Sequence, residues 1–529
     1  MTRLAPFTTR YAARGMVCTV DHLASSAGVA MLRAGGSAVD AAVASSAVLA
    51  VTSQHLCGMG GDLFALVHRR GDTAPEVLNA SGRAGSGADP ARLRAAGLTR
   101  IPRTGEIAAV PVPGCVDGWV ALHERFGRLP LAEVLAPAID YAGAGFPASP
   151  TLALSARRLH ALGDPETADY TSGGELHPGD LVRRPGVARA LGDIAAAGRA
   201  GFYEGEFGKG LLALGGGEYT DDDLASPNAD WVDPLSVDAW GRRIWTVPPN
   251  SQGYLTLAGA WIASGLDLPD DADDPRWAHL LVEAARQAAF DRIEVLHERA
   301  DGRALIAPER LARRRDAIDP GRAASIGGTF GEGGTMYMCA VDGEGTGVSL
   351  IQSNFQGFGS MLIVPGVRIF LQNRGSAFSL EPGHPAEYGP RRRPPHTLAP
   401  ALVTDLDGRL DCVLGTMGGD SQPHILLQLL ARRFVSDERP GEAIAAPRFV
   451  LMGDEPGAGT WDRRGTVRVV LEDTAPRAWV DGLATLGHDV VVARAWGGDF
   501  GHASMIATAG PALAGAADPR ALGGSAAGW

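Results

Sequence analysis

The sequence GEGGTMYMCAVD, residues 331–342, joins a glycine-rich approach to a short apolar segment with the composition of a β-strand. The turn sequence Asp342-Gly343-Glu344-Gly345 follows, and a second strand is predicted over residues 348–353. If the two strands pair as a hairpin centred near Glu344, Thr335 and Ser353 lie opposite each other, since each is nine residues from that centre. The pattern therefore predicts two facing hydroxyl groups at the open end of a hairpin.

Thr335 has an ordinary interpretation as well as a chemical one. Threonine is common in strands, and Gly327-Gly328-Thr329 repeats the same local letters a few residues earlier. A threonine hydroxyl becomes a useful nucleophile only when a base takes its proton. A cut in the chain before Thr335 would supply that base, because the freed α-amine has a reference pKa of about 7.7–8.0. The same hydroxyl could make the cut by attacking the carbonyl of Gly334, where neighbouring glycines permit a strained backbone.

An oxyanion hole is the second requirement of such chemistry. Gly418 and Gly419 follow a predicted strand over residues 410–414 and precede a predicted helix over residues 425–434. Consecutive backbone N–H groups at such a junction can converge on a developing oxyanion. A plain turn between a strand and a helix explains the same pattern, so both interpretations stay open at this stage.

The composition argues against several classes of function. A net charge of −12 and the lack of a long Lys/Arg tract argue against a nucleic-acid partner. Five widely spaced cysteines without a CxxC pair argue against a structural metal and fit reduced thiols in a cytoplasmic protein. No apolar run has the length of a membrane span or the pattern of a signal peptide. The motifs HExxH and GxSxG are absent, which argues against a metallopeptidase and an α/β-hydrolase.

The order of the predicted elements indicates a layered α/β or α+β body. Helices are predicted over residues 21–33 and again after Ser37, which is a plausible N-cap with Asp40 in the first turn. The glycine-rich loop Gly58-Met59-Gly60-Gly61-Asp62 then precedes a strand over residues 63–68. A dinucleotide-binding fingerprint needs the reverse order, strand before loop, so no nucleotide cofactor is expected. The glycines more simply allow the backbone of another segment to approach closely.

Short motifs recur in a fixed order along most of the chain: Gly58 to Asp62, Pro113-Gly114, Pro248-Pro249, Glu283-Ala284, Asp291-Arg292, Thr335 to Asp342, Phe358-Gly359-Ser360, Gly415 to Gly419, Ala446-Pro447-Arg448-Phe449 and Gly501-His502-Ala503. In this order and spacing they resemble the γ-glutamyltranspeptidase family, a branch of the N-terminal nucleophile hydrolases. The resemblance implies an α+β fold, a four-layer αββα sandwich built from one precursor that cuts itself between Gly334 and Thr335. Residues 1–334 would form the large fragment and residues 335–529 the small one. The two fragments would interlock in one structural unit, a heterodimer that can oligomerise further.

The resemblance also implies roles for individual residues. Thr335 matches the family's nucleophile, and Ser353 stands where a second threonine hydrogen-bonds that nucleophile. Gly418 and Gly419 match the oxyanion-hole glycines. On the substrate side, Thr397 matches one of two adjacent serines that bind the substrate carboxylate and His396 replaces the other, while Arg83 is the nearest counterpart of the family's carboxylate-binding arginine.

Three positions depart from the family's pattern. An Asn, a Gln and an Asp that hold the glutamyl substrate are matched here by Phe355, Arg374 and Ala377. Loss of the Asp removes the partner of a substrate α-ammonium group, and an added arginine favours an anionic substrate. The stretch around Arg374 looks more like that of the γ-glutamyltransferase-like acylases and amidases, including oxamate amidohydrolase, than like that of the glutathione-cleaving enzymes.

The resulting prediction is an autoprocessing amidohydrolase or acyltransferase that needs no metal or other cofactor. It would cleave a small-molecule amide, either a γ-glutamyl compound of glutathione metabolism or a related carboxylate-bearing amide, through an acyl-enzyme. Two alternatives remain: an amidase or acylase acting on a non-glutamyl substrate such as an oxamate-like or glutaryl amide, and an uncut, non-catalytic binding protein.

Overall fold

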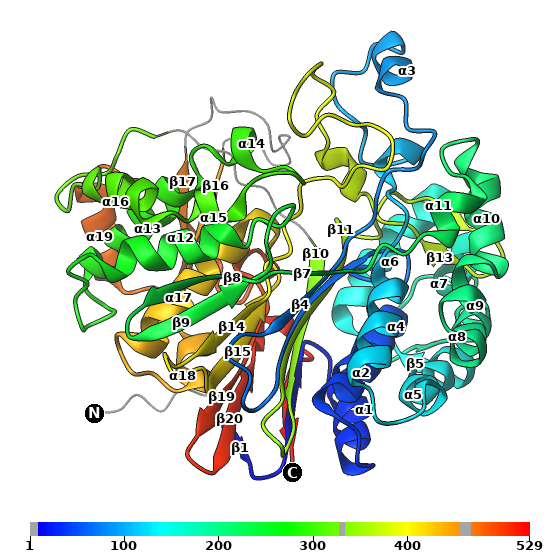
Figure 1. Ribbon diagram of the computed structural model, residues 1–529, viewed down its shortest axis with the longest axis horizontal. Coiled ribbons are helices and arrows are strands. Elements are labelled where there is room, and N and C mark those ends of the chain that lie inside the picture. The colour runs from blue at the N-terminus through cyan, green and yellow to red at the C-terminus, as the bar shows by residue number, and fades with distance from the viewer. Residues whose placement is uncertain (1–8, 327–333, 454–466) are drawn as a thin grey trace.

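The computed structural model describes residues 9–326, 334–453 and 467–529, and within them helices and strands are mixed (Figure 1). The glycine-rich approach at 331–333 and the comparison residue Thr329 lie outside the described residues. Two seven-stranded antiparallel sheets form the centre. The first has the order β1 (Arg10–Ala12), β20 (Ala512–Ala517), β19 (Ala503–Ala509), β15 (Leu410–Thr416), β14 (Ala401–Thr404), β9 (Arg242–Thr246) and β8 (Leu235–Ala239). The second has the order β21 (Ser525–Gly528), β2 (Met16–Thr19), β10 (Gly334–Val341), β11 (Gly347–Phe355), β3 (Asp62–His68), β4 (Glu76–Ala80) and β7 (Asp230–Val232).

The two sheets share a buried apolar core. Phe64 and Tyr337 from the second sheet and Trp245 and Val413 from the first belong to one cluster of buried side chains. The sheets approach closely at Gly415 of β15, where a Cβ atom would lie 2.1 Å from the ring of Tyr337. A glycine is therefore required at that position for β10 to pack on the opposite sheet.

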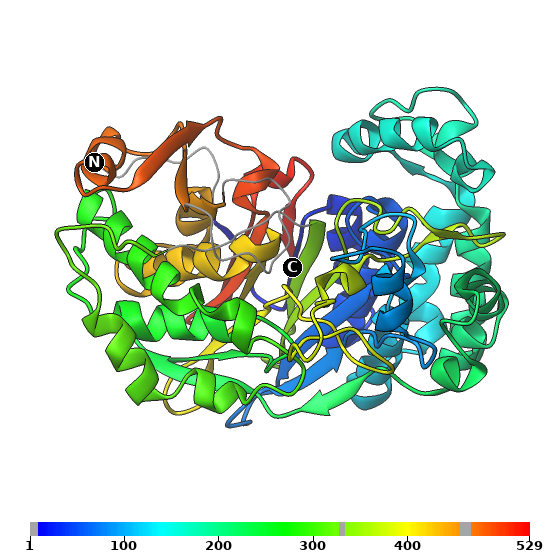
Figure 2. The same ribbon diagram turned by 90° about the horizontal axis from the view of Figure 1, so that it is seen from above.

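Each sheet has helices packed on the face that points away from the other sheet (Figures 1 and 2). The second sheet shares its outer core with α1 (His22–Arg33), α2 (Ala38–Thr52), α4 (Cys115–Phe126), α5 (Leu131–Ala144) and α8 (Pro185–Ala197). The first sheet shares its outer core with α12 (Tyr254–Ser264), α13 (Pro275–Ala289), α17 (Gln422–Phe434) and α19 (Arg477–Thr485). The mixed helix and sheet composition agrees with the α+β prediction.

Shorter elements complete the described chain. A small sheet joins β16 (Phe449–Met452), β17 (Arg468–Glu472) and β18 (Asp489–Ala493), and two-stranded pairs join β5 (Phe146–Pro147) to β6 (Leu181–Val182) and β12 (Ile363–Val364) to β13 (Ile369–Phe370). The remaining helices are α3 (Pro90–Ala95), α6 (Pro150–Leu162), α7 (Ala168–Thr171), α9 (Arg199–Tyr203), α10 (Glu206–Gly215), α11 (Asp221–Ala225), α14 (Arg292–Val295), α15 (Gly302–Leu305), α16 (Pro308–Asp316) and α18 (Pro440–Ala445).

The starts of α1 and α2 are both capped by side chains, and the cap at Ser37 is the one that the sequence predicts. Asp21 accepts a hydrogen bond from the N–H of Leu23 at the start of α1. Ser37 and Asp40 form a reciprocal capping box at the start of α2. Every residue of α2 is buried, which its alanine-rich sequence allows because small side chains let helices pack closely.

The predicted hairpin is confirmed, including its register. Met336 pairs with Gln352 and Val341 with Gly347, so β10 and β11 have the alignment that counting from Glu344 gives. A bulge interrupts the ladder between Gly334 and Met336, at the position of Thr335. A strand predicted over residues 367–372 is shorter, because only β13 (Ile369–Phe370) pairs as a strand while the following backbone bonds to loops.

Candidate active site

The hydroxyl groups of Thr335 and Ser353 meet at the carbonyl of Gly334. The Oγ1 atom of Thr335 donates to the Gly334 carbonyl oxygen at 2.7 Å and lies 3.3 Å from Oγ of Ser353. Ser353 also donates to that carbonyl oxygen, and it accepts from the N–H of Phe355 at 2.7 Å. Both side chains are buried, with Thr335 only 1% exposed. The carbonyl oxygen of Gly334 thus accepts hydrogen bonds from two hydroxyl groups, and one of them belongs to the following residue, Thr335.

Gly418 and Gly419 occupy the junction between β15 and α17. Both have positive φ angles, +139° and +56°, which a side chain would disfavour. The carbonyl of Gly419 accepts from Nε2 of Gln252 at 2.9 Å, and Oε1 of Gln252 accepts from Arg292 at 2.8 Å. This chain of bonds holds the peptide after the glycine pair in a fixed orientation, as a preorganised donor site requires.

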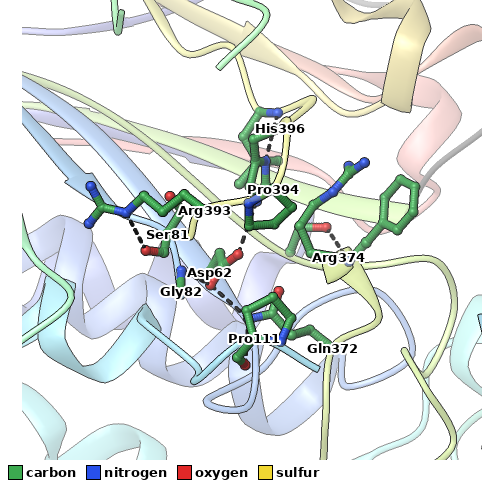
Figure 3. Close-up of polar contacts among 12 residues, drawn as sticks. Asp62, Ser81, Gly82, Pro111, Gln372, Arg374, Arg393, Pro394 and His396 are labelled. Carbon is green, nitrogen blue, oxygen red and sulfur yellow. Dashed lines mark hydrogen bonds and ion pairs between the residues drawn. The ribbon is translucent and has the colours of Figure 1, made fainter. Parts of the chain in front are cut away.

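The carboxylate of Asp62 connects three loop segments, at Gly82, Gln372 and His396 (Figure 3). Asp62 begins β3 and pairs with Ser353 across the ladder. One carboxylate oxygen accepts from the N–H of Gly82 and from Nε2 of Gln372, both at 2.8 Å. The other lies 3.1 Å from Nε2 of His396. The fully buried carboxylate is therefore compensated by three donors.

The hydrogen bonds of His396 fix its tautomer. Burial lowers the pKa of His396 to about 4, so the ring is neutral at pH 7. Its Nδ1 accepts from the N–H of Leu398 at 3.2 Å, which leaves the proton on Nε2, facing Asp62. Both ring nitrogens are occupied, so His396 orients its neighbours rather than acting as a free base.

The glycine loop before β3 does allow a close backbone approach, as predicted. A Cβ atom on Gly60 would lie 2.2 Å from the carbonyl oxygen of Phe370, and one on Gly61 would lie 2.2 Å from that of Ser353. No side chain fits at either position, so the loop carries Asp62 directly against the strand that holds Ser353.

Arg374 is a buried cation with few polar partners. It is 1% exposed, it lies 3.6 Å over the centre of the Phe355 ring, and its NH1 donates to Oγ1 of Thr397 at 3.1 Å. Its Nε has no hydrogen-bond partner among the described residues. Burial lowers the pKa of Arg374 to about 9, although the carboxylates of Asp420 and Asp62 act in the opposite direction. The guanidinium therefore has capacity for an added anion.

Phe355 supports this arrangement from a strained backbone position. Its φ is +75°, in the left-handed region that non-glycine residues rarely adopt. Such positions persist where the surrounding structure fixes them, and they gather at functional sites. Ala377 ends the short 3-10 helix Arg374–Ala377 and brings no carboxylate to it.

A small cavity of about 20 Å³, room for about one water molecule, lies beside Arg374. Asp420 lines it and pairs with Arg292 at 2.7 Å. The lining residues are Gln252, Arg292, Ile293, Leu296, Arg374, Pro395, His396, Thr397 and Asp420.

The residues predicted for substrate binding are not all brought together. Arg374, His396 and Thr397 line this cavity, whereas Arg83 does not. Arg83 instead pairs with Asp230 at 2.6 Å and lies 3.4 Å from the side-chain oxygen of Asn228. Its guanidinium is thus engaged in a structural ion pair.

Sequence reasoning assigned no role to Asp62, Gln252, Arg292 and Asp420. Arg292 enters the sequence analysis only as part of the motif Asp291-Arg292. The one usable signal was Asp62, a carboxylate placed by two glycines at the start of a buried strand. The residues that Gln252, Arg292 and Asp420 contact lie far from them in the sequence, so no local sequence pattern indicates these contacts.

A histidine–carboxylate group elsewhere has the composition of a metal site. Ligand atoms of His279, Glu283 and His488 lie within 4.8 Å of one another. However, His279 and His488 are hydrogen-bonded to each other at 2.8 Å, and Arg286 pairs with Glu283 at 2.8 Å. These contacts already provide His279, His488 and Glu283 with polar partners, and the positive charge of Arg286 would repel a cation at this position.

Comparison with known proteins assigns the chain to a family. The family model of gamma-glutamyltranspeptidase matches residues 24–528. The chain belongs to the gamma-glutamyltranspeptidase family. Its similarity extends over most of its length to the oxamate amidohydrolase proenzyme of Klebsiella pneumoniae, with 38% identity over 97% of this chain and 98% of that protein. The glutathione hydrolase-like YwrD proenzyme of Bacillus subtilis is 37% identical over 82% of this chain and 84% of that protein.

A solved member has nearly the same fold throughout. The crystal structure of cephalosporin acylase from Bacillus halodurans matches with a TM-score of 0.90 and 33% identity, covering 100% of this chain and 98% of that one. The gamma-glutamyltranspeptidase family thus joins this chain to N-terminal nucleophile hydrolases and acylases that act on amides, several of them named as proenzymes. None of the helices in the described ranges combines the length and apolar character needed to cross a membrane, and all five cysteines are buried free thiols.

Proposed function

We propose that this chain is a precursor that cuts itself between Gly334 and Thr335 and then hydrolyses a carboxylate-bearing amide with Thr335 as nucleophile. The fragments 1–334 and 335–529 would stay interlocked as a four-layer αββα sandwich. The position of β10 supports this, because it lies between β2 and β11 in the middle of a sheet. The observation that carries the proposal is the contact of the Thr335 and Ser353 hydroxyls with the carbonyl of Gly334.

In the processing step, Oγ1 of Thr335 attacks the carbonyl carbon of Gly334. The C–N bond to Thr335 breaks, the amine takes up a proton, and an ester forms between Gly334 and the threonine hydroxyl. Water then hydrolyses this ester and frees both the hydroxyl and the α-amine of Thr335. Ser353 is well placed to assist, because its donated hydrogen bond can stabilise charge that develops on the Gly334 oxygen.

In the turnover step, the freed amine takes the proton of Oγ1 as that oxygen attacks the substrate amide. The amide nitrogen leaves with a proton, and an acyl ester remains on Thr335. Water attacks the ester and releases the acid; an amine in place of water would make the reaction a transfer. Backbone N–H groups of Gly418 and Gly419 are the proposed oxyanion donors, supported by the fixed geometry of their turn.

For the substrate, Arg374 favours a carboxylate on the acyl group. It is buried, it lies over the ring of Phe355, it lines the small cavity, and its Nε has no hydrogen-bond partner among the described residues. Thr397 would orient the same group, while His396, whose ring nitrogens are both occupied, would hold the neighbouring segment in place. An α-ammonium group would lack its partner at Ala377, and Arg83 is engaged with Asp230. An oxamate-like or glutaryl amide without an α-ammonium group fits these residues best, which agrees with the name of the Klebsiella relative.

Hydrolysis or transfer of a γ-glutamyl group is the second candidate. Asp420 lines the cavity and could attract an α-ammonium group, and the Bacillus relative is named glutathione hydrolase-like. The pairing of Asp420 with Arg292 weakens this candidate, since much of its charge is already compensated.

An activity panel on purified protein tests these proposals. Oxamate, glutaryl-p-nitroanilide and γ-glutamyl-p-nitroanilide are compared for wild type and for Thr335→Ala. We expect two wild-type fragments on a denaturing gel, turnover of the compounds without an α-ammonium group, and an uncut, inactive Thr335→Ala chain. Turnover of the γ-glutamyl compound alone would favour the second candidate, and an uncut wild type that binds but cleaves nothing would favour a non-catalytic protein.

A further inference from the structure

Arg103 lies in a loop that is fastened next to Arg374. Its backbone carbonyl accepts from Nδ2 of Asn373 at 3.1 Å, and Asn373 directly precedes Arg374. Two residues further on, the N–H of Gly105 donates to the carbonyl of Ser360 at 2.9 Å. The loop is therefore held beside Arg374 at Asn373 and to a second segment at Ser360.

The residues that follow Arg103 strengthen this attachment. The 3-10 helix Ile107–Ala109 packs against the 3-10 helix Arg374–Ala377. A Cβ atom on Gly375 would lie 2.4 Å from the carbonyl oxygen of Ala108, so the two backbones are in direct contact. Such contact fixes where the Arg103 side chain starts relative to the Arg374 guanidinium.

The guanidinium of Arg103 is half-buried and makes no hydrogen bond or ion pair with any side chain in the described parts of the chain. Burial lowers its pKa, and the nearby carboxylate of Asp420, a cavity-lining residue, acts against that shift. Its charge is also close enough to Arg374 to lower the pKa of that residue. These effects agree with the attachment of the Arg103 backbone beside Asn373, while the Arg103 side chain itself is not among the residues that line the cavity.

The local charge is cationic although the chain as a whole carries −12. Arg103, Arg292 and Arg374 gather around two carboxylates, those of Asp62 and Asp420. Among these five described residues, one positive charge is left over if each carboxylate offsets one guanidinium. Surplus charge in a partly buried site attracts a small anion.

We propose that Arg103 is a second carboxylate-binding residue, which holds the anionic end of the acyl group together with Arg374. This inference rests on the proposed function and narrows its substrate to amides of small dicarboxylic acids. Arg83 and Arg393 cannot take this place, because both bind Asp230. Two guanidinium groups around one carboxylate can supply more charge-assisted hydrogen bonds than one can.

Binding of the product acids tests this without any turnover. Oxalate and glutarate are titrated by calorimetry into processed wild type, Arg103→Ala, Arg103→Lys and Arg374→Ala, with neutral glutaramide as the uncharged comparison. Arg100→Ala is the matched control, because Arg100 is an exposed arginine on the same loop. Fragment patterns on a gel and unfolding midpoints identify folded variants, and Arg103→Gln replaces the alanine variant if that one does not fold.

We expect Arg103→Ala to weaken binding of at least one of the two dianions about tenfold or more, since hydrogen bonds to charged groups contribute about 1.5–3 kcal/mol. The lysine variant should recover part of the loss, and Arg100→Ala and the binding of glutaramide should stay within about twofold of wild type. If Arg103→Ala binds both dianions as wild type does while Arg374→Ala does not, the role of Arg103 is refuted. If wild type binds neither dianion, the inference also fails. Binding without any amide cleavage would instead count against the proposed reaction alone.

Discussion

Replacing Ser353 by alanine should slow self-cleavage without preventing folding. Ser353 donates to the carbonyl oxygen of Gly334 and accepts from Oγ1 of Thr335 and from the N–H of Phe355. The alanine variant loses the donor at the oxygen where negative charge develops during the cut. It keeps Thr335, the junction and the hairpin register.

The size of the effect follows from these contacts. Loss of one hydrogen-bond donor to an oxyanion lowers a rate by about 10²–10³. The buried N–H of Phe355 also loses its acceptor, which destabilises the folded chain by about 1–3 kcal/mol. We therefore expect processing about 100-fold or more slower than in wild type, together with a lower unfolding midpoint. Ser353→Thr keeps the hydroxyl and should process far faster than Ser353→Ala.

A pulse of cell-free synthesis followed by a chase measures this rate from the moment the chain is made. The uncut 55.0 kDa chain is separated from its fragments on a denaturing gel at successive times, and mass spectrometry checks that the new N-terminus is Thr335. Ser349→Ala is the matched control. Ser349 lies on the same face of β11, is fully buried and bonds Tyr337 at 2.9 Å, but it makes no contact with the junction.

The control should process within about threefold of wild type, because its lost hydrogen bond is of the same kind but does not stabilise charge on Gly334. Equal rates for Ser353→Ala and wild type would refute the assignment of Ser353 to the processing step. Equal slowing of both alanine variants would show that general destabilisation, rather than the hydroxyl at Gly334, limits the cut.

Further outcomes can be measured on the same preparations. Thr335→Ser should still cut and turn over, since it keeps the hydroxyl; a wholly uncut chain by gel would contradict this. Arg374→Ala should raise KM for an anionic amide about tenfold or more while a neutral amide is unaffected, because only the anion loses a charge-assisted partner. Gly418→Ala should lower kcat by about 10²–10³ and also lower the unfolding midpoint, because a side chain at φ +139° is strained and displaces the oxyanion donor. The unfolding midpoint should fall as pH drops from 6.5 towards 4. Burial lowers the pKa of His396 to about 4, so in this range the unfolded chain binds a proton that the folded chain does not. The variant His396→Gln should reduce the pH dependence of the free energy of unfolding by the equivalent of about one proton, or ~1.4 kcal/mol per pH unit.

The local elements of the fold were predictable where the sequence carries a local signal. The capping residue Ser37 predicted the start of α2, and counting outward from the turn at Glu344 predicted the register of β10 and β11. The strand predicted over residues 367–372 failed for a physical reason. The backbone of Leu371 and Gln372 is hydrogen-bonded to Ser360 and Gly60, which are not in strands. The sequence of the segment itself does not indicate these partners.

The candidate site was predictable only in part, for a related reason. The Thr335–Ser353 contact spans one hairpin, so counting along the chain reaches it. The Asp62–His396 contact joins residues 334 positions apart, and the Gln252–Gly419 bond joins residues 167 apart. Such pairs depend on how the two sheets stack, which a single sequence does not encode locally. The ion pair of Arg83 with Asp230 is a further partner that the local sequence does not indicate.

The same Ser353 hydroxyl would serve both proposed reactions if the hairpin keeps its register after the cut. Before cleavage it donates to Gly334, while Thr335 donates toward both Gly334 and Ser353. Once residue 334 leaves, that acceptor is gone, and the nearest remaining hydroxyl oxygen is Oγ1 of Thr335, 3.3 Å away. Ser353 can then donate to the nucleophile and hold it toward the substrate. A variant lacking this hydroxyl should therefore be impaired twice, in processing and again in turnover per processed molecule, whereas a defect confined to processing would separate the two roles.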